Sequence, residues 1–159
     1  MNILFAGTPE PSAKLLQSLV KNNNINMVGV ITKPDIAQNR GKKIQQSQVS
    51  SAASEVNLPI YKPDNLNSIE FKQILLQLDF DFLIVAAYGK IIPDWMLESP
   101  KIMSINVHYS LLPKYRGASP IQSCLLNGDK KTGITFIKMS NKLDEGDCIQ
   151  KYEIEVHPD

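Results

Sequence analysis

An uninterrupted apolar run over residues 82–87 is the feature that most constrains how this sequence can fold. Such a run predicts a central strand that other elements cover on both faces. Further strands are expected at residues 2–6, 27–31, 58–61, 102–107, 133–139 and 148–156, and helices at residues 11–20, 49–56, 68–78 and 120–126. The segment 33–46 reads as a polar loop. This alternation predicts an α/β fold with a mostly parallel, open sheet, helices on both faces and an antiparallel edge from the last strands.

Composition limits the classes of protein that the sequence can represent. The 159 residues are enough for one domain with its own core. The formal net charge is +1, so any attraction to nucleic acid must come from a local patch. Cys124 and Cys148 lack a metal-type spacing, which favours reduced thiols. We expect a cytoplasmic location, because the N-terminal apolar run is too short for a signal peptide and no segment is long enough to span a bilayer.

Several common catalytic motifs are missing. Residues 7–10 follow the first strand but do not form a dinucleotide fingerprint, and the sequence contains no P-loop and no nucleophile elbow. The histidines, His108 and His157, have no neighbouring cysteine pair, so we expect no metal site. We therefore expect the chemistry to depend on fixed polar groups and a diffusible co-substrate.

Asn106 and His108 are the first candidates for that chemistry. They lie two positions apart at the end of a predicted strand, so they face the same side of the sheet. An amide supplies a permanent donor and an imidazole can donate or transfer a proton, which suits a reaction that forms an oxyanion. The apolar, proline-containing segment that follows them is typical of a small-molecule pocket. A pair that only holds a turn is the structural alternative.

Asp144 lies in a second polar segment, an acidic turn around Gly146. An exposed acidic turn is the ordinary interpretation of this pattern. If the chain brings this carboxylate near His108, it would stabilise the protonated imidazole.

Six segments resemble the folate-dependent formyltransferases. They are residues 5–9, 40–43, 85–93, 106–122, 132–135 and 143–147, in the order that the family has them. The resemblance implies a Rossmann-like formyltransferase fold and 10-formyltetrahydrofolate as co-substrate. It implies that Asn106, His108 and Asp144 are catalytic. It also implies that the folate is bound by Ser110, Leu111, Leu112 and Pro113, with Tyr88 and Gly89 at the pterin side.

The acceptor amine differs among members of this family, and the basic segment 33–43 is the part of the sequence that favours one of them. In members that formylate initiator methionyl-tRNA, at the start of translation, this segment contacts the acceptor end of the tRNA. Arg40, Lys42 and Lys43 would neutralise phosphates there. The alternatives are an amino-sugar-nucleotide N-formyltransferase and an inactive folate-binding fragment.

The same resemblance gives expectations about domains. We expect residues 1–159 to form one monomeric catalytic domain, truncated at its C-terminal side. The family continues into further helices and an OB-like tRNA-binding domain, which the sequence lacks.

Overall fold

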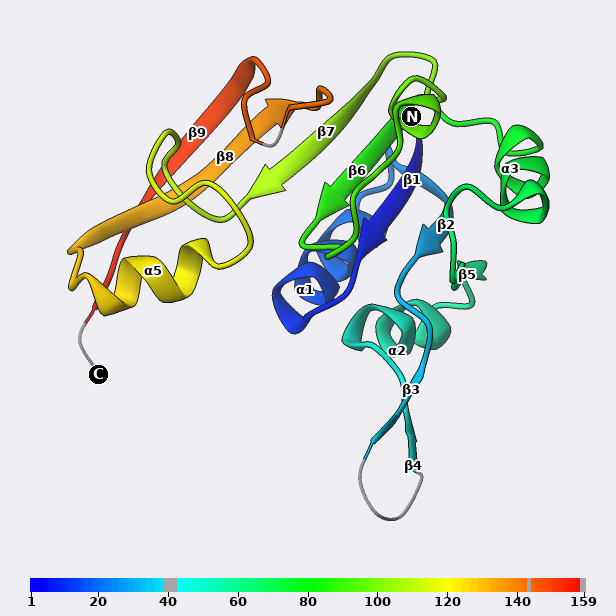
Figure 1. Cartoon of the computed structure of the whole chain (residues 1–159), viewed down its shortest axis with the longest axis horizontal. Coiled ribbons are helices and arrows are strands. Elements are labelled where there is room, and N and C mark those ends of the chain that lie inside the picture. The colour runs from blue at the N-terminus through cyan, green and yellow to red at the C-terminus, as the bar shows by residue number, and fades with distance from the viewer. Residues whose placement is uncertain (39–42, 143, 158–159) are drawn as a thin grey trace.

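The computed structural model describes residues 1–38, 43–142 and 144–157. A seven-stranded sheet forms its centre, with the strand order β5-β2-β1-β6-β7-β8-β9 (Figure 1). Its strands are β1 (Asn2–Gly7), β2 (Asn26–Ile31), β5 (Ile60–Tyr61), β6 (Phe82–Ala86), β7 (Met103–His108), β8 (Lys131–Lys138) and β9 (Cys148–Glu155). The first five in that order pair in parallel, whereas β8 and β9 add antiparallel pairs. The predicted sheet class and its antiparallel edge are confirmed.

Within the described residues, five helices connect these strands. They are α1 (Glu10–Val20), α2 (Gln48–Glu55), α3 (Ile69–Leu76), α4 (Asp94–Leu97) and α5 (Pro120–Leu126). Serine hydroxyls start two of them: Ser47 accepts a hydrogen bond from the Ser50 backbone in α2, and Ser68 accepts one from Phe71 in α3. Four of the five were predicted within about two residues of their bounds, which is ordinary precision for helix ends.

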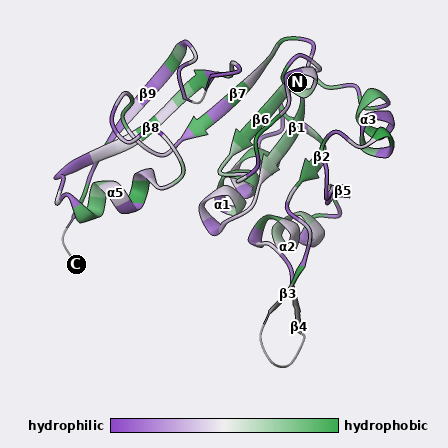
Figure 2. Ribbon diagram, viewed as in Figure 1, coloured by the Kyte–Doolittle hydropathy of each residue, from purple (hydrophilic) through white to green (hydrophobic). Residues whose placement is uncertain are grey.

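The two faces of the sheet carry separate hydrophobic cores. One core combines Leu4 and Leu83 with Phe71 and Leu75 of α3 and Met96 of α4. The other packs Phe5, Ala86 and Val107 against side chains of α1 and α2. Figure 2 shows β1 and β6 coloured as hydrophobic along much of their length. Residues 82–86 of the apolar run are thus covered on both faces, as predicted, whereas Ala87 lies after the strand and is exposed.

Three elements, two short strands and the helix α4, differ from the sequence-based expectation. The segment 33–46 is not wholly a loop, because β3 (Ile36–Gln38) and β4 (Lys43–Gln45) pair as an antiparallel ladder. Each of these strands has three residues, too few to show the alternation that would reveal a strand. Helix α4 is a single turn, too short to show helical periodicity. No helix in the described ranges has the length and apolar character needed to cross a membrane.

Candidate active site

The carboxyl end of β7 brings Asn106 and His108 to the edge of the sheet where ligands bind in open α/β folds. Asn106 pairs in register with Val85 of β6 on one side and with Ile137 of β8 on the other. His108 pairs with Thr135 of β8. Both side chains leave the strand on the same face, as their spacing predicted.

Asp144 joins these two side chains, although it is far away in the sequence. Its Oδ1 atom accepts a hydrogen bond of 2.9 Å from Asn106 Nδ2. Its Oδ2 atom lies 3.6 Å from His108 Nδ1 and accepts a 2.9 Å hydrogen bond from the Gly117 backbone. Asp144 and His108 are both buried, with exposed fractions of 9% and 5%. The structure therefore assembles the three residues that were predicted to act together, and Asp144 is not an ordinary exposed turn residue.

The backbone of Tyr115 fixes which nitrogen of His108 carries a proton. The Tyr115 carbonyl oxygen lies 2.8 Å from His108 Nε2, and a carbonyl only accepts, so Nε2 must donate. The Nδ1 atom faces the Asp144 carboxylate, but 3.6 Å is longer than a hydrogen bond. A second proton, on Nδ1, would make the imidazole ring cationic. The ring would then form an ion pair with Asp144, and its Nδ1–H would stay free to donate to a third group.

Left-handed backbone occurs at two residues that build this cluster. Tyr115 has φ of +57° and Asp144 has φ of +51°. Such values are uncommon outside glycine, although aspartate tolerates them better than most residues. Tyr115 and Gly117 were not predictable as partners from the sequence, because both act through backbone atoms. The Arg116–Gly117 turn after a strand was the available signal for such contacts.

The segment predicted to bind folate divides into buried and accessible positions. Ser110 and Leu112 are buried, whereas Leu111 and Pro113 are more accessible. Leu111 lines an open depression of about 380 Å³. The other lining residues are Lys114, Tyr115, Asp129, Lys131, Thr132 and Glu153. The depression does not include Asn106, His108 or Asp144. The folate contacts of this segment stay a prediction.

Tyr88 and Gly89 follow β6, next to the point where the strand order reverses between β1 and β6. The Thr8 hydroxyl, just after β1, donates to the Tyr88 carbonyl, just after β6, at 2.8 Å and so links the ends of the two strands. The Tyr88 ring is buried, and burial raises the pKa of its hydroxyl to about 12. Gly89 has φ of +78°, a left-handed backbone conformation that favours glycine, and an added Cβ would also lie 2.5 Å from Nζ at the flexible end of Lys33. A pterin contact at these two residues also stays a prediction.

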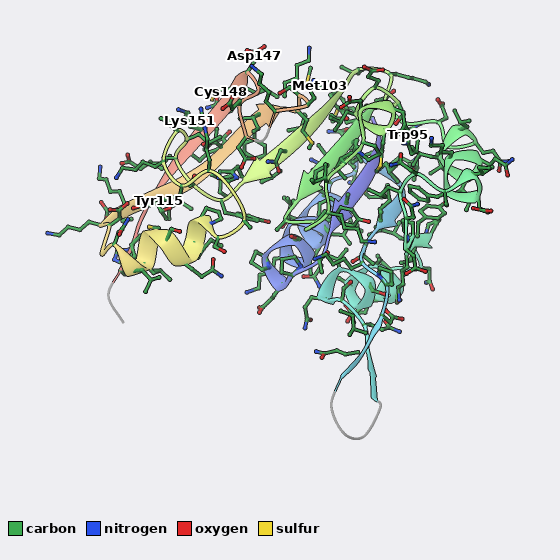
Figure 3. The ribbon with its side chains drawn as sticks, in the orientation of Figure 1. Trp95, Met103, Tyr115, Asp147, Cys148 and Lys151 are labelled. Carbon is green, nitrogen blue, oxygen red and sulfur yellow. The ribbon has the colours of Figure 1, made fainter. Side chains whose placement is uncertain are left out.

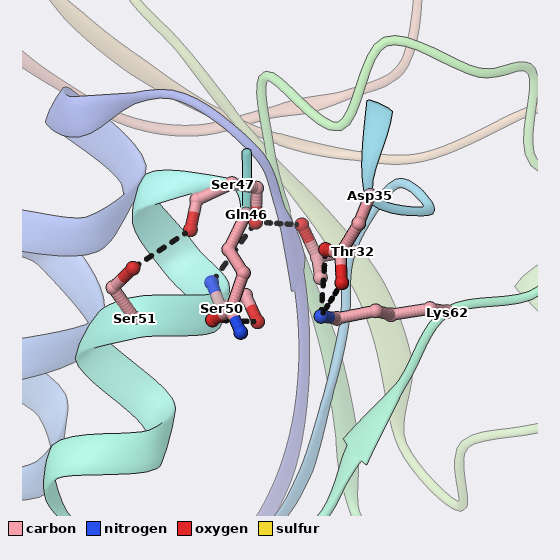
Figure 4. Close-up of polar contacts among 7 residues, drawn as sticks. All are labelled: Thr32, Asp35, Gln46, Ser47, Ser50, Ser51 and Lys62. Carbon is pink, nitrogen blue, oxygen red and sulfur yellow. Dashed lines mark hydrogen bonds and ion pairs between the residues drawn. The ribbon is translucent and has the colours of Figure 1, made fainter. Parts of the chain in front are cut away.

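Of the residues predicted to bind tRNA, Arg40 and Lys42 lie outside the described residues, and Lys43 is the first residue of β4. The two ends of their segment are held by polar contacts (Figure 4). Asp35 accepts hydrogen bonds of 2.7 and 2.8 Å from Lys62. The Thr32 and Ser47 hydroxyls lie 2.6 Å apart, which ties the end of β2 to the start of α2.

Comparison with known proteins places the chain in a family. The formyl transferase family model matches residues 1–159. The methionyl-tRNA formyltransferase of Thermotoga maritima is 44% identical over 158 residues, which are 99% of this chain and 50% of that protein. The enzyme of the same name from Buchnera aphidicola is 48% identical over 149 residues, 94% of this chain and 46% of that protein. The chain thus spans about half the length of these relatives.

Solved structures share the fold at lower identity. Phosphoribosylglycinamide formyltransferase from Anaplasma phagocytophilum matches with a TM-score of 0.77 and 20% identity, over 99% of this chain and 73% of that chain. The sugar 3N-formyl transferase WlaRD, solved in the presence of dTDP and 5-N-formyl-THF, matches with a TM-score of 0.64 and 24% identity, over 98% and 52% of the two chains. The match to the family model over residues 1–159 shows that this chain belongs to the formyl transferase family.

Proposed function

We propose that residues 1–159 form the catalytic domain of a methionyl-tRNA formyltransferase, which transfers a formyl group from 10-formyltetrahydrofolate to the amino group of initiator methionyl-tRNA. The observation that carries this proposal is the cluster of Asn106, His108 and Asp144 at the carboxyl edge of the sheet. Identities of 44% and 48% to methionyl-tRNA formyltransferases support the choice of acceptor. The relatives also support folate as the formyl donor, since WlaRD was solved with a formylated folate.

The chemistry requires one bond to form and one to break. The amine nitrogen of the acceptor adds to the formyl carbon, and the formyl oxygen becomes an oxyanion. Collapse of this intermediate breaks the bond between the formyl carbon and N10 of the folate. The proton lost by the amine ends on N10, so that atoms and charge balance. The protein has to stabilise the oxyanion and to guide this proton.

The candidate residues supply suitable groups for both tasks. Asn106 uses one N–H on Asp144, and an amide has a second N–H that can donate to the oxyanion. His108 in its protonated form can donate from Nδ1, because the Nε2 proton is already engaged with Tyr115. The Asp144 carboxylate holds the amide in place and offers an acceptor beside the imidazole. Fixed donors of this kind each contribute on the order of 10²–10³ in rate.

The basic segment is proposed to bind the acceptor end of the tRNA through Arg40, Lys42 and Lys43. Its support is the charge of the sequence and two contacts that hold the ends of the segment. Thr32 contacts Ser47, and Asp35 accepts a hydrogen bond from Lys62. If Arg40 neutralises one phosphate, Arg40→Ala lowers the slope of log affinity against log salt by about 0.7 to 0.9. Lys101→Ala is the control, because Lys101 is an exposed cation just before β7, at the opposite edge of the sheet.

A formylation assay tests the proposal directly. The protein is supplied with 10-formyltetrahydrofolate and, in separate reactions, methionyl-tRNA, glycinamide ribonucleotide and an amino sugar nucleotide. We expect formylation of methionyl-tRNA only. Formylation of the amino sugar nucleotide would assign the protein to that branch of the family. Folate binding by calorimetry without transfer to any acceptor would contradict the proposal and favour a folate-binding fragment.

A further inference from the structure

Two buried hydroxyls, those of Thr135 and Ser110, bond to the loop between β7 and α5, and among the described contacts neither forms a hydrogen bond with Asn106, His108 or Asp144. Thr135 lies on β8 opposite His108 and is fully buried. Its hydroxyl donates to the Ser110 carbonyl at 2.7 Å and accepts from the Leu112 backbone at 3.1 Å. One hydroxyl therefore binds both sides of the turn that begins just after His108.

Ser110 continues this set of contacts toward His108. Its side chain is fully buried, and its hydroxyl donates to the Lys114 carbonyl at 2.6 Å. Lys114 directly precedes Tyr115, whose carbonyl accepts from His108 Nε2. The Thr135 hydroxyl thus holds the start of the loop, at Ser110 and Leu112. The Ser110 hydroxyl holds Lys114, the residue before Tyr115.

Strand β8 and strand β9 add two further contacts to the same loop. Gly133, two residues before Thr135, leaves room for Leu111, because an added Cβ would lie 2.5 Å from Leu111 Cδ2. Lys151 of β9 donates to the Leu112 carbonyl at 2.6 Å, and Figure 3 labels Lys151 and Tyr115 at this end of the molecule. The loop is therefore bound to the antiparallel edge of the sheet along its length.

We propose that Thr135 and Ser110 are positioning residues, which hold the loop so that the Tyr115 carbonyl keeps the His108 proton on Nε2 and leaves Nδ1 for the reaction. The kinetic consequences of this inference rest on the proposed formyl transfer, whereas its consequence for the tautomer of His108 does not. The hydroxyl of Thr135 is essential to it, since a valine of similar shape would leave the Ser110 carbonyl and the Leu112 N–H without a buried partner.

The structural part is tested by NMR of the imidazole nitrogens. Long-range 1H–15N spectra distinguish the two tautomers of a neutral imidazole, and loss of one set of signals in His108→Gln assigns His108. In the unaltered protein we expect His108 to be protonated on Nε2 alone when the ring is neutral. In Thr135→Val and in Ser110→Ala we expect a mixture of tautomers. Thr135→Ser, which keeps the hydroxyl, should restore the single tautomer.

Thr132→Val is the matched control, because it makes the same change on the same strand. Among the described contacts, the Thr132 hydroxyl makes no hydrogen bond, so the spectrum of His108 should not change. Far-UV circular dichroism establishes that each variant is folded. If Thr135→Val does not fold, Ser110→Ala decides the question. A single, unchanged tautomer in a folded Thr135→Val or Ser110→Ala variant would overturn the proposal.

The kinetic part separates positioning from a general loss of structure. A small displacement of a reacting group lowers rates by as much as about 10²-fold. We therefore expect Thr135→Val to lower kcat by about 10- to 100-fold with a smaller change in KM for the formyl donor, and Thr135→Ser to restore most of kcat. An equal loss in Thr132→Val would contradict this role. If the unaltered protein formylates no acceptor, the proposed function fails, while the NMR spectra still decide whether Thr135 positions His108.

Discussion

Asp144 Oδ1 accepts a hydrogen bond from Asn106 Nδ2 at 2.9 Å, so the amide and the carboxylate form one unit at the end of β7. The contact also fixes which end of the Asn106 amide carries the nitrogen, because a carboxylate only accepts. The remaining N–H of Asn106 is thereby oriented before any substrate arrives, which is the condition for strong stabilisation of a developing charge.

Replacement of Asp144 by asparagine tests this unit with little change in backbone. Asparagine tolerates the left-handed φ of +51° at this position, whereas alanine does so less well. The asparagine nitrogen would face either Asn106 Nδ2 or the Gly117 N–H, both of which are donors. We expect Asp144→Asn to lower kcat/KM for formyl transfer by at least about 10²-fold while the protein stays folded. Activity within a few-fold of the original would exclude a catalytic carboxylate at this position.

Burial of Tyr88 predicts a loss of stability in alkali. The pKa of its hydroxyl is raised from 10.0 to about 12, so between these values the unfolded chain releases a proton that the folded protein keeps. The free energy of unfolding therefore falls as pH rises from 10 to 12, by at most about 1.4 kcal/mol per pH unit for this group. Denaturant titrations at several pH values should show a shallower decline for Tyr88→Phe. The control is Tyr152→Phe, at a side chain that is 58% exposed.

The Tyr115 hydroxyl predicts a pKa change at Asp129. The pKa of Asp129 is lowered mainly by the 2.8 Å hydrogen bond that this hydroxyl donates, with a further contribution from Lys114. Tyr115→Phe removes the larger cause, so the pKa of Asp129 should rise toward its usual value. A 13C NMR titration of the aspartate carboxyl groups measures the change. The Tyr115 backbone keeps its contact with His108, so formyl transfer should change little; a large loss of activity would show that the hydroxyl has another role.

The buried centre of the sheet should dominate stability. Leu83 of β6 is fully buried in the core beneath α3 and α4, and its replacement by alanine leaves a cavity. We expect Leu83→Ala to lower the free energy of unfolding by about 2–5 kcal/mol. Leu126→Ala is the matched control, because its side chain is 88% exposed and surface changes are usually within about 0.5 kcal/mol. Similar losses in the two variants would contradict the assignment of the core.

The sheet was predictable because apolar runs and helical spacing report on burial. Residues 82–86 of the apolar run form β6 at the centre of the sheet, and Asn106 and His108 lie side by side because strand spacing alone puts them on one face. The position of Asp144 was not predictable from spacing. It depends on the antiparallel return of β8 and on the turn that follows it, and the link to His108 came only from the family resemblance.

The backbone contacts that orient His108 and Asp144 escaped prediction for a different reason. The Tyr115 carbonyl and the Gly117 N–H are backbone atoms, and every residue has such atoms, so the sequence does not mark them. Thr135 is marked by its residue type, but a threonine on a strand is ordinary, and its role appears only when the loop is folded against it. The β3–β4 ladder was missed because strands of three residues are too short to show a pattern of alternation.

The left-handed backbone at Tyr115 and Asp144 has a consequence for protein engineering. Each non-glycine residue in this conformation costs on the order of 1–2 kcal/mol relative to ordinary backbone. A library sorted only for heat resistance should therefore become enriched in glycine at Tyr115, whereas Asp144 should resist replacement because its carboxylate accepts two hydrogen bonds. The contact of Tyr115 with His108 is made by a backbone carbonyl, so we expect the thermostable members of such a library to keep their activity.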